Sequence, residues 1–187
     1  VPYLAIVSAF SQICEYILNS PNSEVIVEKL KNGMRPERRI VLSNTVEGFW
    51  DVFNDLPRNK RRPSFYDSNA FLRTQFIFRD FVRLLSTCVS PIVLVLEDLH
   101  WSDASSLQLI KTVISDQYST FLFIGSYRSD QICHSHPLTS LVRSVNHSIL
   151  ASTDLYLEGF GKEIVNEIIS HLLEQPPEDC VSLSNVV

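Results

Sequence analysis

Apolar residues recur at helical spacing in several stretches of the chain and form uninterrupted runs in others. The helical stripes predict four main helices, which begin at Pro2, at Ser68 or Asn69, at Ser102 or Asp103, and at Lys162. The first ends near Asn19, the second near Ser86 and the last near Glu174, where Pro176-Pro177 follows. Shorter helices are expected over 25–30 and 46–53, separated by Asn32-Gly33 and the basic run 35–39, and after Pro137.

Two apolar runs predict β-strands. Residues 92–96 follow Pro91 without a polar interruption, which is typical of a central parallel strand covered on both faces. Residues 121–126 form the second strand, and the helix between the two runs makes a right-handed βαβ unit with parallel strands. A third, shorter strand is expected over Leu155–Leu157.

Charged side chains stand where these two strands end. Glu97 and Asp98 follow the first strand, and Arg128 follows the second. Open α/β sheets bind ligands at the carboxyl ends of their strands, where two carboxylates suit Mg²⁺ and a guanidinium suits a phosphate. From the residues alone, the acids are equally compatible with a helix cap, and Arg128 is compatible with an ion pair to Asp130.

The segment Leu-Glu-Asp-Leu-His-Trp-Ser-Asp, residues 96–103, resembles the Walker B motif of AAA-type STAND regulatory ATPases. These are signal-transduction ATPases of the maltose-regulator, large LuxR-type and sensor-kinase-associated groups, which carry origin-recognition-complex-like AAA domains. Gly125-Ser126-Tyr127-Arg128 is similar to the sensor-1 segment of that family. The resemblance implies ATP and Mg²⁺ as cofactors, with Glu97 and Asp98 as the metal-binding and catalytic acids and Arg128 sensing the phosphate.

The division of labour between the two acids stays open. By position the resemblance gives the metal role to Glu97, through water, and the water-polarising role to Asp98. Many P-loop enzymes have aspartate first and glutamate second, so both acids are candidate metal ligands and both are candidate catalytic residues. His100 and Trp101 are expected to be structural, because neighbours on a turn point in different directions.

The fold expected from the resemblance is α/β: a three-layer, P-loop NTPase-like parallel sheet of the AAA type with flanking helices, incomplete at both ends. Residues 1–175 would form a partial ATPase core, and residues 176–187 the start of a truncated lid or linker. None of the five glycines belongs to a Gly-x-x-x-x-Gly-Lys-Ser/Thr motif, the loop that holds nucleotide phosphates. That loop and the first strands are expected upstream of Val1.

Composition narrows the choice of partners and compartment. The net charge of −5 argues against general nucleic-acid binding. The basic run 58–62 is therefore better explained as a solvated loop than as a nuclear-localisation or phosphate-binding patch. No run is long enough to span a membrane and no signal peptide is evident, which favours the cytoplasm. The four cysteines are widely spaced and expected to be reduced, and the spacing in Cys133-His134-Ser135-His136 matches no structural zinc site.

The function expected is a nucleotide-dependent regulatory switch. Its partners would be other domains of the same polypeptide, with nucleotide-dependent self-association, and no membrane. The alternative is a degenerate, non-hydrolysing scaffold of the same fold that binds proteins. Nucleic-acid binding through the two basic runs ranks last.

Overall fold

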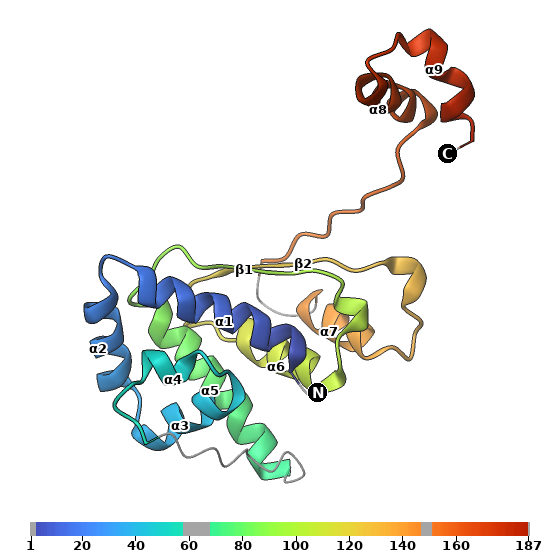
Figure 1. Cartoon of the computed structure of the whole chain (residues 1–187). Coiled ribbons are helices and arrows are strands. Elements are labelled where there is room, and N and C mark those ends of the chain that lie inside the picture. The colour runs from blue at the N-terminus through green and yellow to red at the C-terminus, as the bar shows by residue number, and fades with distance from the viewer. Residues whose placement is uncertain (1–2, 58–67, 147–150, 187) are drawn as a thin grey trace. The chain divides into compact units, whose positions relative to one another are not determined.

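A computed structural model describes residues 3–57, 68–146 and 151–186. The chain divides into two compact units, residues 1–151 and 152–187. The division expected from the sequence, an ATPase core over 1–175 followed by the start of a lid or linker, stays a prediction. The first unit is mainly helical, and Figure 1 labels its α-helices and strands. In chain order its elements are α1 (Leu4–Asn19), α2 (Ser23–Gly33), α3 (Pro36–Thr45), α4 (Phe49–Val52), α5 (Ser68–Ser86), β1 (Val93–Leu96), the short 3-10 helix η1 (Leu99–Trp101), α6 (Ala104–Ile114), β2 (Leu122–Gly125), the short 3-10 helix η2 (Ser129–Gln131) and α7 (Pro137–Asn146).

The two strands form a small parallel sheet, so the first unit is broadly α/β. Val93 lies opposite Leu122, and Leu96 lies opposite Gly125. The connection between the strands passes through α6, which begins at an N-cap aspartate: Asp103 accepts a hydrogen bond from the Ser106 N–H at 3.0 Å. The predicted parallel βαβ unit and the start of its helix are therefore confirmed.

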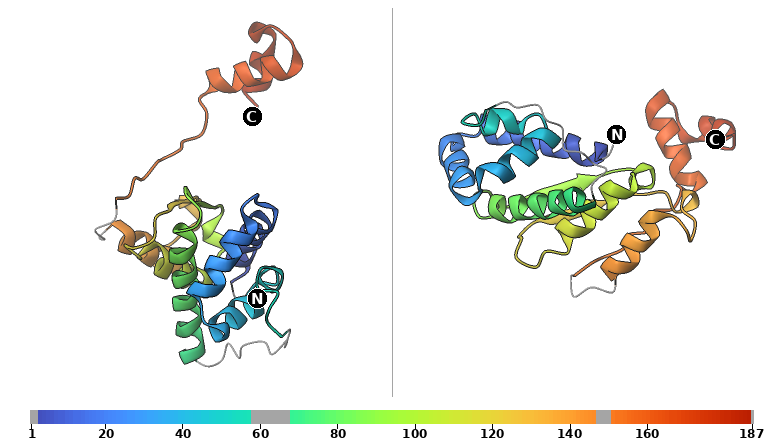
Figure 2. Two further views of the ribbon diagram at one scale, coloured as in Figure 1. Left: turned by 90° about the vertical axis from the view of Figure 1, so that its left-hand side faces the viewer. Right: turned by 90° about the horizontal axis from the view of Figure 1, so that it is seen from below.

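The core of the first unit is built on aromatic side chains from helices far apart in the sequence. Phe10 of α1 is 1% exposed, and its ring lies edge-on to Phe78 of α5 with centroids 4.8 Å apart. Phe49 and Phe81 meet in the same way, also at 4.8 Å. These edge-to-face contacts are a favoured geometry for aromatic pairs and hold α1, α4 and α5 together. Helices α2 and α3 pack against α5, and α4 packs against α1 and α3 (Figure 2).

The helices of the first unit cover only one face of its sheet (Figure 1). On the other face four large apolar side chains are 47–56% exposed: Val93, Val95, Leu122 and Ile124. The expectation that β1 is a central strand covered on both faces is wrong for the residues that the structure describes. An unbroken apolar run indicates that both faces suit burial, but it does not specify what covers them.

The two basic runs of the sequence, 35–39 and 58–62, belong to the first unit. The basic run 35–39 does not separate two helices, because most of it belongs to α3. Arg39 is buried there: it bonds both carboxylate oxygens of Asp55, at 2.8 and 2.9 Å, and lies over the Phe53 ring. The second basic run, 58–62, lies outside the described residues.

The second unit is a pair of short helices, α8 (Lys162–Leu173) and α9 (Pro177–Ser184). The Asn166 side chain donates to the Pro177 carbonyl at 2.9 Å, and the Ser170 hydroxyl donates to the Gln175 carbonyl at 2.6 Å. The prolines at 176–177 end α8 as predicted, but Pro177 also begins a helix that the sequence reading missed. The strand expected at Leu155–Leu157 is wrong: this segment is extended, unpaired and at least 83% exposed.

The last features of the fold concern the cysteines and the length of the helices. All four cysteines are free thiols, as expected. In the part of the chain that the structure describes, no helix has both the length and the apolar composition that a membrane span requires.

Candidate functional site

The two strands end together, and this brings the predicted site residues to one edge of the sheet. Because β1 and β2 are parallel and paired up to Leu96 and Gly125, the segments that follow them leave the sheet side by side. Glu97 and Asp98 come directly after β1, and Arg128 lies three residues beyond β2. The acid pair and the arginine therefore share an edge, as the βαβ reading predicted.

Backbone hydrogen bonds continue between the two turns beyond the strands. The Ser126 N–H donates to the Leu96 carbonyl at 3.0 Å, and the Leu99 N–H donates to the Ser126 carbonyl at 2.9 Å. A side chain adds a third link, since the Arg128 N–H donates to Nδ1 of His100 at 3.3 Å. The turn that carries the acids and the turn that carries Arg128 are thus joined at three points.

His100 is the buried member of this group. Its side chain is 2% exposed, and as an acceptor at Nδ1 the neutral ring carries its hydrogen on Nε2. Nε2 lies 4.0 Å from Oδ1 of Asp98, too far for a hydrogen bond. The expected structural role of His100 agrees with this position. Trp101 is 77% exposed; its N–H donates to the Asp98 carbonyl at 2.9 Å, and its ring lies 5.3 Å from the His100 ring.

Asp98 adopts an unusual backbone conformation. Its φ of 53° and ψ of 41° place it in the left-handed region. Among the described non-glycine residues, Tyr3 and Glu174 also have a positive φ. Aspartate tolerates this region better than most residues. The result is a sharp change of direction after Glu97, with the Asp98 side chain 69% exposed at the edge of the sheet. Such conformations are found preferentially at functional sites.

Arg128 pairs with Asp130 in this structure, the alternative that the sequence had left open. Its Nε and Nη2 atoms lie 3.3 and 3.0 Å from the two carboxylate oxygens. The hydrogen bond to Asp130 and the charge of that group, with a smaller contribution from Asp98, raise the pKa of Arg128. The same bond lowers the pKa of Asp130. Both side chains are more than 60% exposed, so water competes for this pair and it stabilises the fold little.

The oxygen ligands at this edge suit a hard cation only in part. Among the described residues, no cluster of three or more histidine, cysteine, aspartate or glutamate side chains is arranged to hold a metal. Mg²⁺ is commonly held by one or two carboxylates with water and substrate phosphates, and Glu97 and Asp98 offer that minimal set. Near Arg128, Cys133 contacts Ser135 and His136 accepts from the Leu138 N–H, so these side chains have local partners.

The edge is open rather than enclosed. Two hollows on the described surface, with volumes of about 530 and 290 Å³, both border α5, and neither is lined by Glu97, Asp98 or Arg128. The sequence did not predict the hydrogen bond between the Arg128 N–H and His100, because the two residues lie 28 positions apart and no local pattern indicates it.

Compared with known proteins, the chain matches no family model, no curated protein and no solved structure.

Proposed function

We propose that this chain supplies the Walker B-like acids and the sensor-1-like arginine of a STAND/AAA-type P-loop ATPase domain. In this proposal the domain binds ATP with Mg²⁺ and acts in the cytoplasm as a nucleotide-dependent switch in signal transduction. One observation carries it: Glu97, Asp98 and Arg128 lie at one edge of a parallel sheet, on turns joined by hydrogen bonds. This is the edge at which α/β sheets bind their ligands.

The acids have complementary tasks in this proposal. Glu97 holds the hydrated metal ion, and Asp98 orients and polarises the attacking water. When bound, Mg²⁺ supplies positive charge that stabilises the transferring phosphoryl group. The backbone of Asp98 makes a sharp turn, and no hydrogen bond from a described residue occupies its 69% exposed side chain. The carboxylate can therefore accept a hydrogen bond from water.

Arg128 acts as the sensor because its present partner is easily exchanged. The Asp130 carboxylate holds the guanidinium in an exposed ion pair, and phosphate oxygens accept the same fork of hydrogen bonds with more charge. A terminal phosphate that draws the side chain from Asp130 would change contacts on only one of the two turns. A nucleotide that makes different contacts in two states is what a switch requires.

The proposal also assigns a role to the exposed face of the sheet. Val93, Val95, Leu122 and Ile124 present a continuous apolar surface, because opposite residues of the register point the same way. Parallel sheets are normally covered on both faces. We therefore infer that helices of a three-layer, P-loop NTPase-like domain cover this face, that further strands extend the sheet, and that the glycine-rich phosphate loop comes with them.

In this proposal the chain is part of a longer polypeptide that also contains the glycine-rich phosphate loop, which we call the parent. ATP hydrolysis by the parent tests the proposed function. The wild type is compared with Asp98→Asn and Glu97→Gln, measuring ATP binding and phosphate release in Mg²⁺. The proposal predicts that Asp98→Asn keeps binding and loses most hydrolysis, by at least about 100-fold, as expected for a general base. The 187-residue chain alone should bind ATP weakly or not at all, because it lacks the phosphate loop. Hydrolysis by the chain alone, or full activity in Asp98→Asn, would contradict the proposal.

A second candidate is the non-hydrolysing scaffold of the same fold, which would use its surface to bind other domains of the same polypeptide or another copy. The observation that favours it is the Arg128–Asp130 pair, which occupies the proposed sensor in the structure. This candidate predicts no Mg²⁺-dependent ATP binding by the parent, so the same assay separates the two.

A further inference from the structure

The larger of the two hollows lies between α3 and α5 and has a volume of about 530 Å³; we call it the α3–α5 groove. Its apolar part is formed by Val41, Phe76 and Ile77. Ile77 is buried, but Phe76 is 47% exposed, although it belongs to a helix whose Phe78 and Phe81 side chains lie in the core. A half-exposed ring that lines a hollow is a ready contact for an apolar side chain of a partner.

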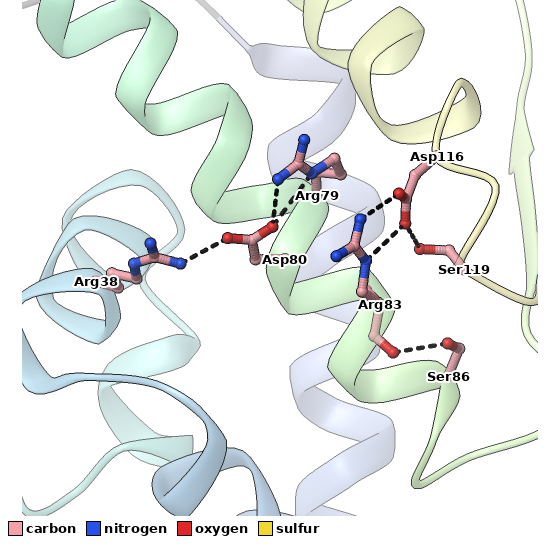
Figure 3. Close-up of polar contacts among 7 residues, drawn as sticks. All are labelled: Arg38, Arg79, Asp80, Arg83, Ser86, Asp116 and Ser119. Carbon is pink, nitrogen blue, oxygen red and sulfur yellow. Dashed lines mark hydrogen bonds and ion pairs between the residues drawn. The ribbon is translucent and has the colours of Figure 1, made fainter.

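Arginines surround this apolar part, and they share too few carboxylates. Arg38 of α3 and Arg79 of α5 both bond to Asp80, from opposite sides, at 2.6 and 2.7 Å (Figure 3). Arg79 also lies over the Phe76 ring, 4.9 Å from its centroid. These two guanidinium groups therefore share one negative charge, and part of their hydrogen-bonding capacity stays unused.

Two more cations border the same surface without such a partner. Arg73 lines the α3–α5 groove, and Lys111 lines the adjoining hollow of about 290 Å³, which shares Phe76 and Arg79 with it. Neither the Arg73 nor the Lys111 side chain forms a hydrogen bond or ion pair with any described residue. Asp116 of the second hollow is already bonded to Arg83 and Ser119 (Figure 3). The surface thus carries an excess of positive charge on a chain whose net charge is −5.

We propose that the α3–α5 groove binds an acidic peptide segment of a partner protein, in which an apolar side chain is flanked by aspartate or glutamate. The apolar side chain packs on Phe76, and the carboxylates pair with Arg73, Arg79 and Lys111. Arginine next to an exposed aromatic ring is the composition of interface hot spots, and the surplus charge selects acidic partners. This proposal does not depend on ATP binding.

A peptide fits this surface better than a nucleic acid does. Glu37 and Asp80 interrupt the cations of the groove, so a continuous line of phosphates would meet two carboxylates. A peptide places its charges at intervals set by its sequence and offers an apolar group for Phe76. The chemistry therefore points to a protein partner, with nucleic acid as a competing outcome of the test.

The test begins with a randomised peptide library selected on the immobilised chain. The most enriched peptide is then labelled with fluorescein, and its affinity is measured by fluorescence anisotropy. The proposal predicts acidic peptides with a central apolar residue, whose binding weakens as salt is raised. A selection that enriches nothing, or enriches peptides without acidic residues, overturns it.

Variants then locate the binding surface. Arg73→Glu should weaken the peptide by at least about tenfold and Arg73→Gln by less, since reversal adds repulsion to the loss of attraction. The matched control is Arg143→Glu, which makes the same charge change at an exposed position of α7. Circular dichroism checks that each variant is folded. Equal weakening by Arg73→Glu and Arg143→Glu, or equally strong competition by a single-stranded oligonucleotide, contradicts the proposal.

Discussion

The Asp116 carboxylate joins α5 to the loop between α6 and β2, and it thereby fixes the start of the strand that leads to Arg128. The effect of removing its charge on the stability of the first unit can be predicted from the structure. The Asp116 side chain is only 4% exposed and accepts a paired hydrogen bond from the Arg83 guanidinium and another from the Ser119 hydroxyl. Figure 3 shows this carboxylate between α5 and the loop before β2. Arg83 also lies over the Tyr118 ring of that loop, 4.8 Å from its centroid.

The substitution Asp116→Asn keeps the size of the side chain and removes its charge. Breaking a fully buried ion pair costs about 3–5 kcal/mol, but water can reach the Arg83 side chain, so we expect a loss of about 2 kcal/mol for Asp116→Asn. Urea unfolding followed by tryptophan fluorescence is the assay, because Trp50 and Trp101 both belong to the first unit. With a typical urea dependence, the midpoint should fall by about 1 M.

The pH dependence of this loss follows from the pKa of Asp116. Burial opposes ionisation, but the hydrogen bonds from Arg83 and Ser119 and the charge of Arg83 outweigh it, so the folded pKa lies below its ordinary value of 3.8. The ionised carboxylate therefore contributes stability that is complete above pH 3.8 and is lost as pH falls through the folded pKa. The difference between wild type and Asp116→Asn should shrink over that acidic range.

Asp130→Asn is the matched control, because Asp130 also pairs with one arginine but is exposed. It should leave the urea midpoint unchanged. If Asp116→Asn were no more destabilising than Asp130→Asn, or if its effect persisted below the folded pKa, the reasoning about this buried pair would be refuted.

Three other predictions concern the core, a helix cap and the thiols. Phe10→Ala should lower the free energy of unfolding by about 3–5 kcal/mol, measured by the same fluorescence assay, whereas Tyr16→Ala, at a 57% exposed position of the same helix, should have little effect. Asp103→Ala removes the N-cap of α6 and should cost about 1 kcal/mol, while Gln108→Ala on the exposed side of that helix should cost much less; equal losses would exclude the cap as the cause. A thiol reagent at pH 8 should label Cys133 first, because it is exposed and its bond with Ser135 lowers its pKa, whereas burial and the nearby Asp51 and Glu15 raise the pKa of Cys14 to about 12. Cys133→Ser should abolish the fast phase, and fast labelling of Cys14 would contradict its burial.

Long helices were predictable because their apolar stripes are long. In α1 and α6 the stripe is buried almost as the sequence suggests, with Ile6, Phe10 and Ile17 on one helix and Leu107, Ile110 and Val113 on the other. Helix α3 was not predicted, because its buried face carries Arg39. The Arg39 guanidinium is paired with Asp55 and lies over the Phe53 ring, and these contacts allow its burial. A charged residue on the buried face interrupts the apolar stripe by which a helix is recognised in a sequence.

Strands were harder to predict, because a strand needs a neighbour that local sequence does not specify. The Val93–Leu96 run pairs with Leu122–Gly125, whereas Leu155–Leu157, which is also apolar and aromatic, pairs with no strand in the part of the chain that the structure describes. The candidate site followed from strand order alone, since parallel strands bring their carboxyl ends together. The left-handed turn at Asp98 and the bond between Arg128 and His100 depend on tertiary structure, and the sequence carries no signal for them.

Mg²⁺-dependent ATP binding by the parent polypeptide tests the central proposal most directly. Titration with a fluorescent ATP analogue, with and without Mg²⁺, compares the wild type with Arg128→Ala and with Arg143→Ala as the control. The proposal predicts saturable binding that requires Mg²⁺, weakens by about tenfold in Arg128→Ala and is unchanged in Arg143→Ala. If the wild-type parent does not bind ATP, the switch proposal is wrong and the scaffold function remains.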